Sequence, residues 1–89
     1  MRRTDLAVRL IRARSALGWS QETAADKIHV HRNTVIGWER TKNPTVPNFA
    51  QLLQAAEAYG IDRLELMPLW HKARKARKRR GHDNGGGGK

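Results

Sequence analysis

The feature that most constrains the fold of this chain is the spacing of its apolar residues, which is helical from about residue 4 to residue 70. In the first segment, Leu6, Leu10, Ala13 and Leu17 follow one another at intervals of three and four residues, which places them on one face of a helix. Later segments repeat this spacing, and no stretch alternates apolar and polar residues as a half-buried strand would. The sequence therefore predicts an all-α protein.

Capping signals divide this pattern into separate helices. Gly18 has the position of a helix C-cap, and Ser20 is the expected N-cap of a second helix. A third helix is expected over residues 31–40. Its start is less well defined than its centre, because His31 is a weak N-cap.

Two more helices follow a loop that contains Asn43-Pro44. Asn48-x-x-Gln51 and Asp62-x-x-Glu65 both have the spacing of a capping box. Pro68 lacks a backbone donor, so the last helix is expected to break there or to restart with Pro68 in its first turn. The prediction is five short helices in one compact domain, followed by a tail.

The net charge of +10 is concentrated at the C-terminal end of the 89 residues. Residues 1–70 hold ten Lys and Arg against seven Asp and Glu, a net of +3, whereas residues 71–89 hold eight against one, a net of +7. We therefore predict a folded domain over residues 1–70 and a basic, then glycine-rich, extension over residues 71–89. The glycine-rich end from residue 81 is expected to be disordered, and the charge favours a polyanionic partner.

Composition argues against several other classes of protein. Cysteine is absent, which excludes disulfides, thiolate metal sites and cysteine nucleophiles. No apolar run approaches the roughly 18 residues of a membrane span. His29 and His31 lack the i, i+4 spacing and the nearby carboxylate of a zinc site, and no Ser/His/Asp arrangement is plausible. We expect no enzyme activity, no cofactor, no metal and no membrane association.

The most specific signal surrounds the second and third helices. The sequence from Gly18 to Ala25 is GWSQETAA, that from Ile28 to Arg40 is IHVHRNTVIGWER, and AYGI follows at 58–61. This pattern resembles the Cro/phage-repressor (xenobiotic-response-element type) helix-turn-helix family over about residues 5–67. The resemblance implies a compact five-helix, repressor-like domain that binds double-stranded DNA.

In such a motif the second helix lies in the major groove, and its N-terminal residues contact base edges. The resemblance places base contacts at Arg32, Asn33, Ile36 and Gly37. Arginine can pair bidentately with guanine, and asparagine with adenine. Gly37 has no side chain, and either a close approach to DNA or simple tolerance would explain it.

The resemblance also implies phosphate contacts from Gln21, Arg40 and Lys42. The alternatives are an ordinary exposed helix start for Gln21 and solvated charges for Arg40 and Lys42. Arg14 and Glu39 match positions that pair across the first and third helices, so we expect a structural ion pair rather than an acid–base couple.

This sequence departs from the family pattern at the ends of its motif helices. His29 occupies a turn position that usually holds glycine, which is tolerable because histidine accepts positive φ more readily than β-branched residues do. His31 replaces the usual Ser or Thr cap, and Thr41 replaces a common glycine after the third helix. These departures affect the expected loop contacts but not the expected fold.

Two features at the C-terminal end have open alternatives. The basic residues could form an arm along the DNA backbone, which we favour, or a solvated end; they are Lys72, Arg74, Lys75, Arg77, Lys78, Arg79 and Arg80. An apolar cluster could close the core or form a symmetric homodimer face; it consists of Leu66, Met67, Leu69 and Trp70.

The sequence thus predicts a sequence-specific, double-stranded DNA-binding transcriptional regulator, most like a phage Cro-type or immunity repressor that occupies an operator. Its expected location is the cytoplasm of a bacterial or phage-infected cell, at the nucleoid. The antitoxin of a toxin–antitoxin pair remains an alternative of the same fold. A transcription adaptor that binds nucleic acid without sequence preference is an alternative from another class.

Overall fold

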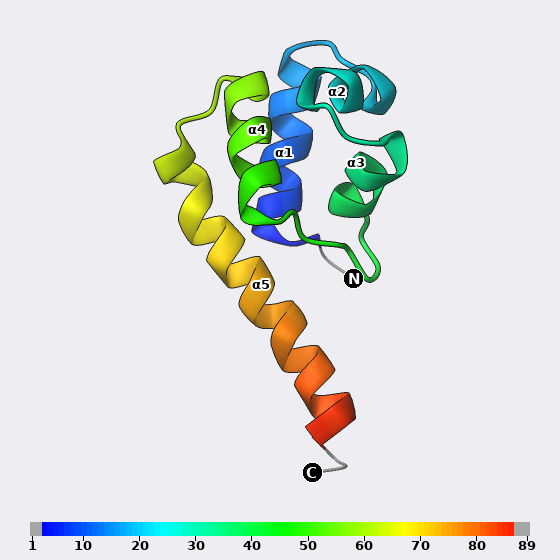
Figure 1. Ribbon diagram of the computed structural model, residues 1–89, viewed down its shortest axis with the longest axis vertical. Coiled ribbons are helices and arrows are strands. Elements are labelled where there is room, and N and C mark those ends of the chain that lie inside the picture. The colour runs from blue at the N-terminus through cyan, green and yellow to red at the C-terminus, as the bar shows by residue number, and fades with distance from the viewer. Residues whose placement is uncertain (1–2, 87–89) are drawn as a thin grey trace.

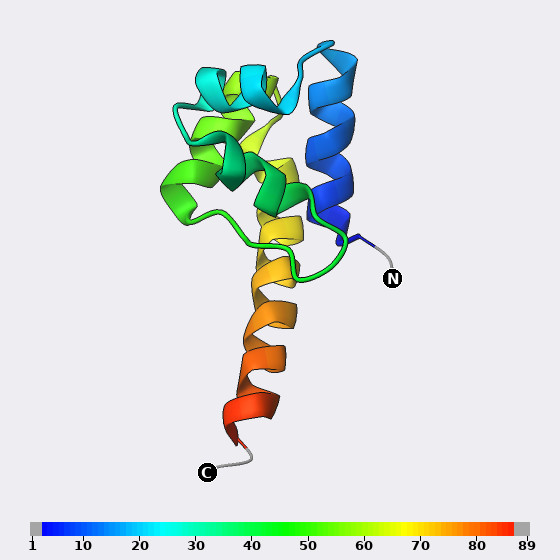
Figure 2. The same ribbon diagram turned by 90° about the vertical axis from the view of Figure 1, so that its right-hand side faces the viewer.

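The structure is a computed structural model that describes the backbone of residues 3–86 and the side chains of residues 3–76. Its elements, in order, are α1 (Asp5–Ala16), α2 (Gln21–Ile28), α3 (Arg32–Glu39), α4 (Phe49–Tyr59) and α5 (Arg63–Gly86). Figures 1 and 2 show that α1 to α4 form a compact bundle with the first turns of α5, whereas the rest of α5 extends beyond it as a single helix. Over residues 3–86 there is no strand, so the predicted all-α, five-helix fold is confirmed.

Side-chain caps explain where the first, second and fourth helices begin. Thr4 and Ser20 accept hydrogen bonds from the backbone amides of Ala7 and Thr23 at 3.1 and 3.0 Å. Asn48 forms a complete capping box with Gln51. Each such cap stabilises its helix by about 1 kcal/mol.

Two histidines lie at the junction of α2 and α3, one in a left-handed turn and the other as a helix N-cap. His29 ends α2 in the left-handed conformation, with φ 67° and ψ 45°. His31 caps α3, because its Nδ1 accepts a hydrogen bond from the amide of Asn33 at 3.1 Å. The start of α3, which the sequence left poorly defined, is therefore Arg32.

The loop after α3 shows why Thr41 can replace a glycine. Arg40 ends the helix with φ −65° and ψ 146°, a conformation open to any residue. The positive φ of this connection occurs instead at Asn43, at 49°, and asparagine tolerates the left-handed region.

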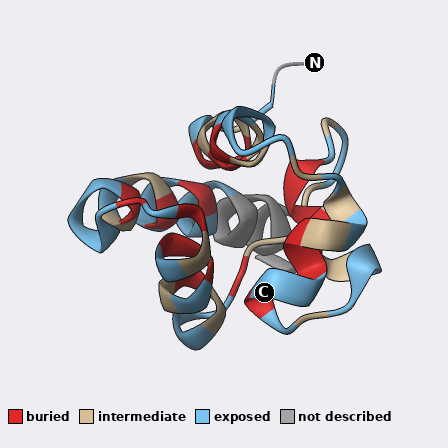
Figure 3. Cartoon of the chain, turned by 90° about the horizontal axis from the view of Figure 1, so that it is seen from above, coloured by how far each residue is buried: buried red, intermediate tan, exposed pale blue. Residues whose placement is uncertain are grey.

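The core lies where the inner faces of all five helices meet, as the buried segments in Figure 3 show. Its largest fully buried apolar side chains are Leu10, Ile28, Val35, Leu52 and Leu66. Alanines occupy several of the other buried positions and allow the helices to approach closely. Those with an exposed fraction of 2% or less are Ala7, Ala24, Ala25 and Ala55.

The expectation that Pro68 interrupts the last helix is wrong, because α5 passes through it without a break. Proline removes one backbone donor, which leaves the carbonyl of Leu64 without its usual partner. Leu64 and Pro68 are both exposed, so this turn faces solvent, where water can take that place. Leu66 and Trp70, on the buried side of the same turns, hold the helix against the core.

The helix also continues beyond the predicted limit of the folded domain. Ala73 is only 5% exposed and belongs to the core cluster, and α5 spans Arg63–Gly86. The disorder expected from residue 81 stays a prediction. Extending an existing helix avoids the cost of nucleation, since each added residue contributes a hydrogen bond. Residues 87–89 lie outside the described residues.

The apolar cluster of α5 contributes two of its side chains to the core. Leu66 and Trp70 are 0% and 6% exposed, and the indole Nε1 of Trp70 donates a hydrogen bond of 2.7 Å to the carbonyl of Pro47. Met67 and Leu69 are half-buried and pack against the same core. Two of the four side chains of the possible homodimer face are thus buried within the chain, and homodimerisation stays a prediction.

Candidate nucleic-acid interface

The two faces of α3 have opposite character. Val35 and Trp38 are 0% and 3% exposed and fix the inner face to the core. Arg32 and Asn33, in the first turn, are exposed, and Ile36 is half-buried one turn later. The N-terminal half of α3 thus offers hydrogen-bonding side chains to solvent from a rigidly held helix.

Gly37 does not belong to this exposed face. It is buried, and its carbonyl accepts a hydrogen bond of 3.0 Å from the amide of Thr45 in the following loop. A Cβ atom at this position would lie 2.5 Å from the Thr45 hydroxyl. The base contact predicted for Gly37 is therefore corrected: the close approach that requires glycine comes from this chain's own loop.

Arg14 and Glu39 form a two-point ion pair between α1 and α3. Arg14 Nε lies 2.8 Å from Glu39 Oε2, and Nη2 lies 2.9 Å from Oε1. The Glu39 side chain is only 4% exposed, and its hydrogen bonds raise the pKa of the Arg14 guanidinium. Arg14 also donates to the carbonyl of Trp19 at 2.9 Å, so one guanidinium joins α1, the turn before α2, and the end of α3.

Gln21 takes part in the same network. Its Nε2 donates a hydrogen bond of 2.9 Å to Glu39 Oε1, and its side chain is half-buried. This bond fixes the orientation of the amide at the start of α2. The amide still has a second N–H group to donate.

Beside this network lies a shallow pocket of about 380 Å³. Its lining residues are Arg3, Ile11, Arg14, Gln21, Ile36, Glu39, Arg40 and Thr41. The one carboxylate among them is paired with Arg14, so Arg3 and Arg40 leave the pocket with a positive charge. The pocket therefore combines two of the three residues expected to contact phosphate, Gln21 and Arg40, with half-buried Ile36. Lys42 is exposed but does not line it.

Arg3 is a member of this pocket that the sequence did not suggest. Its Nε donates a hydrogen bond of 2.9 Å to the carbonyl of Glu39, at the end of α3. A cation at a helix C-terminus complements the helix dipole. No local pattern could have indicated this contact, because Arg3 and Glu39 are 36 residues apart in the chain.

The basic residues of α5 point to different surroundings. Lys72 lies 2.9 Å from Asp5 in an ion pair with α1, and the guanidinium of Arg74 lies 4.8 Å from the ring centroid of Trp70. Lys75 is exposed. Four further residues of the expected arm have side chains outside the described part of the chain; they are Arg77, Lys78, Arg79 and Arg80.

Among the described residues, no group of three or more His, Asp or Glu side chains could hold a metal ion. In the same part of the chain, no helix combines the length and the apolar character that a bilayer requires.

The helices α2 and α3, joined by a short turn and with an exposed first turn on α3, have the arrangement of a helix-turn-helix motif. A family described as helix-turn-helix matches residues 8–66, more than half of the chain. The chain therefore belongs to this Cro/C1-type helix-turn-helix family, whose members are DNA-binding regulators. No curated protein and no solved structure matches the chain.

Proposed function

We propose that this protein is a sequence-specific regulator that occupies an operator in double-stranded DNA, in the manner of a phage Cro-type or immunity repressor. The observation that carries this proposal is the first turn of α3, where Arg32 and Asn33 are exposed. Val35 and Trp38 bury the opposite face of the same helix. An isolated charge run would not provide this combination of exposed, hydrogen-bonding side chains and a fixed backbone.

In the proposed complex, α3 lies in the major groove with its N-terminal end toward the bases. Arg32 donates two hydrogen bonds to a guanine, and Asn33 exchanges two with an adenine. Ile36 is placed to contact a thymine methyl group, which is the apolar feature of the groove. Arg32 has no ion pair with a carboxylate of the described residues, so its guanidinium is available to bind a base.

The pocket at the end of α3 supplies the backbone contact. Gln21, oriented by Glu39, and the guanidinium groups of Arg3 and Arg40 surround a space that suits one DNA phosphate. Such a contact fixes the register of α3 on the duplex without selecting sequence. Lys42 and the basic residues of α5 after Lys75, from Arg77 to Arg80, add further backbone contacts in this proposal.

Repression would follow from occupancy, because a protein bound at an operator obstructs polymerase. The experiment that tests the proposal is selection of bound duplexes from a random pool by the full chain. We expect enrichment of one short sequence, and chromatography of the selected complex gives the number of chains on it. Recovery of duplexes with no shared sequence would instead support an adaptor that binds nucleic acid without preference.

A further inference from the structure

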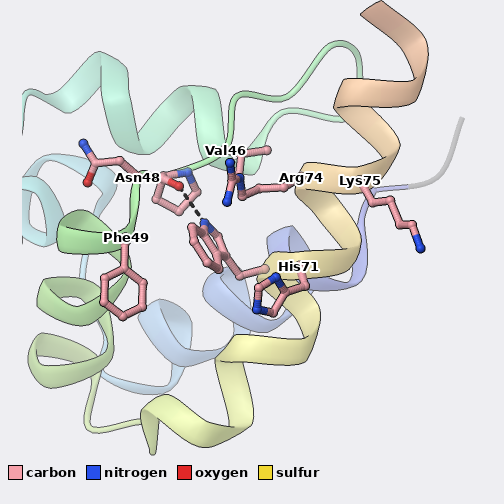
Figure 4. Close-up of a pocket in the computed structure, with 8 residues that line it drawn as sticks. Val46, Asn48, Phe49, His71, Arg74 and Lys75 are labelled. Atoms are coloured by element: carbon pink, nitrogen blue, oxygen red, sulfur yellow. Dashed lines mark hydrogen bonds between the residues drawn. The ribbon is translucent and has the colours of Figure 1, made fainter. Parts of the chain in front are cut away.

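A second hollow lies on another side of the molecule, where the loop before α4 meets the middle of α5 (Figure 4). Its volume is about 1020 Å³, and its lining residues are Val46, Pro47, Asn48, Phe49, Trp70, His71, Arg74 and Lys75. It shares no described lining residue with the pocket beside α3. DNA bound by α3 therefore does not account for it.

The floor of this hollow is rigid. Trp70 is 6% exposed, and its indole is fixed by the 2.7 Å hydrogen bond to the carbonyl of Pro47, drawn as the dashed line in Figure 4. The ring of Phe49 lies 5.6 Å from that of Trp70, tilted by 47°. Phe49 nevertheless remains 48% exposed, so the hollow has a fixed apolar wall that nothing in the described chain covers.

The rim of the hollow is positively charged. Arg74 stacks on Trp70, with 4.8 Å between the guanidinium and the ring centroid, and Lys75 follows it on α5. None of the described lining residues is acidic, and neither cation has an ion pair with a carboxylate of residues 3–76. Stacking holds the planar guanidinium in place, so little entropy is lost when it binds a carboxylate through two hydrogen bonds.

We propose that this hollow binds an acidic segment of a partner protein that carries a large apolar side chain among its carboxylates. The apolar side chain covers Phe49 and Val46, and the carboxylates bind Arg74 and Lys75. Charge complementarity selects an acidic partner, and the exposed wall selects an apolar anchor. A DNA phosphate would satisfy the cations but would leave Phe49 exposed.

The test uses the full chain and a synthetic peptide with two central leucines flanked on each side by three glutamates, titrated by calorimetry. We expect saturable binding that weakens about tenfold or more in Phe49→Ala and in Arg74→Ala. Arg74→Lys should restore only part of the loss, since lysine cannot form the two-point contact. A peptide with serine in place of both leucines should bind at least about tenfold more weakly.

Matched controls are available on other surfaces. Leu64→Ala removes a 72% exposed apolar side chain from α5, and Lys27→Ala removes a cation that lies 5.8 Å from the Trp19 ring centroid. Both should bind the leucine peptide as the unaltered chain does. Phe49→Ala should leave affinity for duplex DNA unchanged.

Several results would overturn the proposal. They are no saturable binding at about 1 mM peptide, equal losses in the two control variants, and equal binding of the leucine and serine peptides. A loss of duplex affinity in Phe49→Ala would assign the hollow to DNA instead. Because the inference does not depend on α3, it stands or falls separately from the proposed operator binding.

Discussion

At the scale of single residues, Glu39 has the greatest influence on the candidate interface. Its carboxylate accepts three hydrogen bonds, two from Arg14 and one from Gln21, and its carbonyl accepts one from Arg3. A charge that is 4% exposed is tolerated only when it is paired and hydrogen-bonded in this way. The Glu39 side chain thereby fixes α3 relative to α1 and α2, and its backbone carbonyl joins α3 to the N-terminal segment.

The pKa of Tyr59 depends in part on the same two charged groups, Glu39 and Arg14. Burial, and to a smaller extent the charge of Glu39, raise the pKa of Tyr59 from 10.0 to about 12, against an opposing effect of Arg14. Because the pKa is higher in the folded state than in the unfolded state, the free energy of unfolding should be unaffected below pH 10 and should fall as the pH rises toward 12. The chain has one tyrosine, so tyrosinate absorbance measures this group alone.

In Tyr59→Phe the free energy of unfolding should fall less above pH 10, because the contribution of the tyrosine is absent. Titration of the lysines lowers it equally in both proteins. The hydroxyl of Tyr59 is buried without a hydrogen-bond partner among the described residues. The substitution should therefore change stability at neutral pH by no more than about 1 kcal/mol. Titration of folded Tyr59 with an ordinary pKa would contradict this account.

Gly37 gives a second prediction at this scale. Gly37→Ala should lower the free energy of unfolding by about 1–3 kcal/mol, because the new Cβ meets the Thr45 hydroxyl at 2.5 Å. Adding Thr45→Ala removes that oxygen, so the double variant should recover the loss and gain up to about 1 kcal/mol of helix propensity. Chemical denaturation of the unaltered chain, Gly37→Ala, Thr45→Ala and the double variant measures the coupling free energy between the two positions. Additive effects would show that the contact does not matter.

These residues also show which contacts the sequence can predict and which it cannot. The apolar spacing and the caps were sufficient for the fold, and the family pattern indicated the ion pair of Arg14 and Glu39. Arg32 and Asn33 are exposed, and their base contacts stay a prediction. The role of Gly37 could not be predicted, because its neighbour Thr45 comes from a loop whose path depends on tertiary packing. Arg3 was missed for the same reason, since its contact spans 36 residues.

At the scale of helices, α5 differs most from its prediction. Pro68 correctly indicates that one helical hydrogen bond is lost. The local sequence does not show that Leu66 and Trp70, on either side of it, are buried in the core. The apolar contacts of the whole helix outweigh one missing bond. The boundary predicted at residue 70 followed the change in charge, whereas the core extends to Ala73.

The exposed position of Pro68 leads to a stability prediction. Alanine there restores a helical hydrogen bond without losing packing, a gain of about 3 kcal/mol in helix propensity. Part of this gain, about 1 kcal/mol, is lost because the unfolded chain becomes more flexible. Pro68→Ala should therefore raise the free energy of unfolding, measured by urea denaturation, by about 2 kcal/mol. A decrease in the free energy of unfolding would contradict this account, because it would mean that the backbone of α5 at this position has a conformation that proline favours over alanine.

At the scale of the whole molecule, most of the net charge and the proposed base contacts lie in different parts. The exposed polar side chains of α3 lie on a domain of modest net charge, +3 over residues 1–70, whereas residues 71–89 carry +7 of the net +10. Basic residues supply affinity that depends on salt, whereas base contacts supply sequence preference. The two contributions should therefore be separable by deletion.

Removing residues 77–89 tests that separation while it leaves Ala73, Arg74 and Lys75 in place. If the deleted residues neutralise about four phosphates, the slope of log affinity against log salt should flatten by about 3.6. Selectivity between the chosen site and random duplex should stay the same. An unchanged slope, measured by fluorescence anisotropy over a range of salt, would show that this segment does not contact DNA.

The central claim is that the first turn of α3 recognises bases, and binding of Arg32→Ala to the selected site tests it most directly. Affinity should be measured for that duplex, for every single-base variant of it and for random duplex, at one salt concentration. We predict a loss of about 1–3 kcal/mol that comes with lost preference at one base position, while affinity for random duplex stays nearly constant. An equal loss on selected and random duplexes, or no loss on either, would contradict the claim.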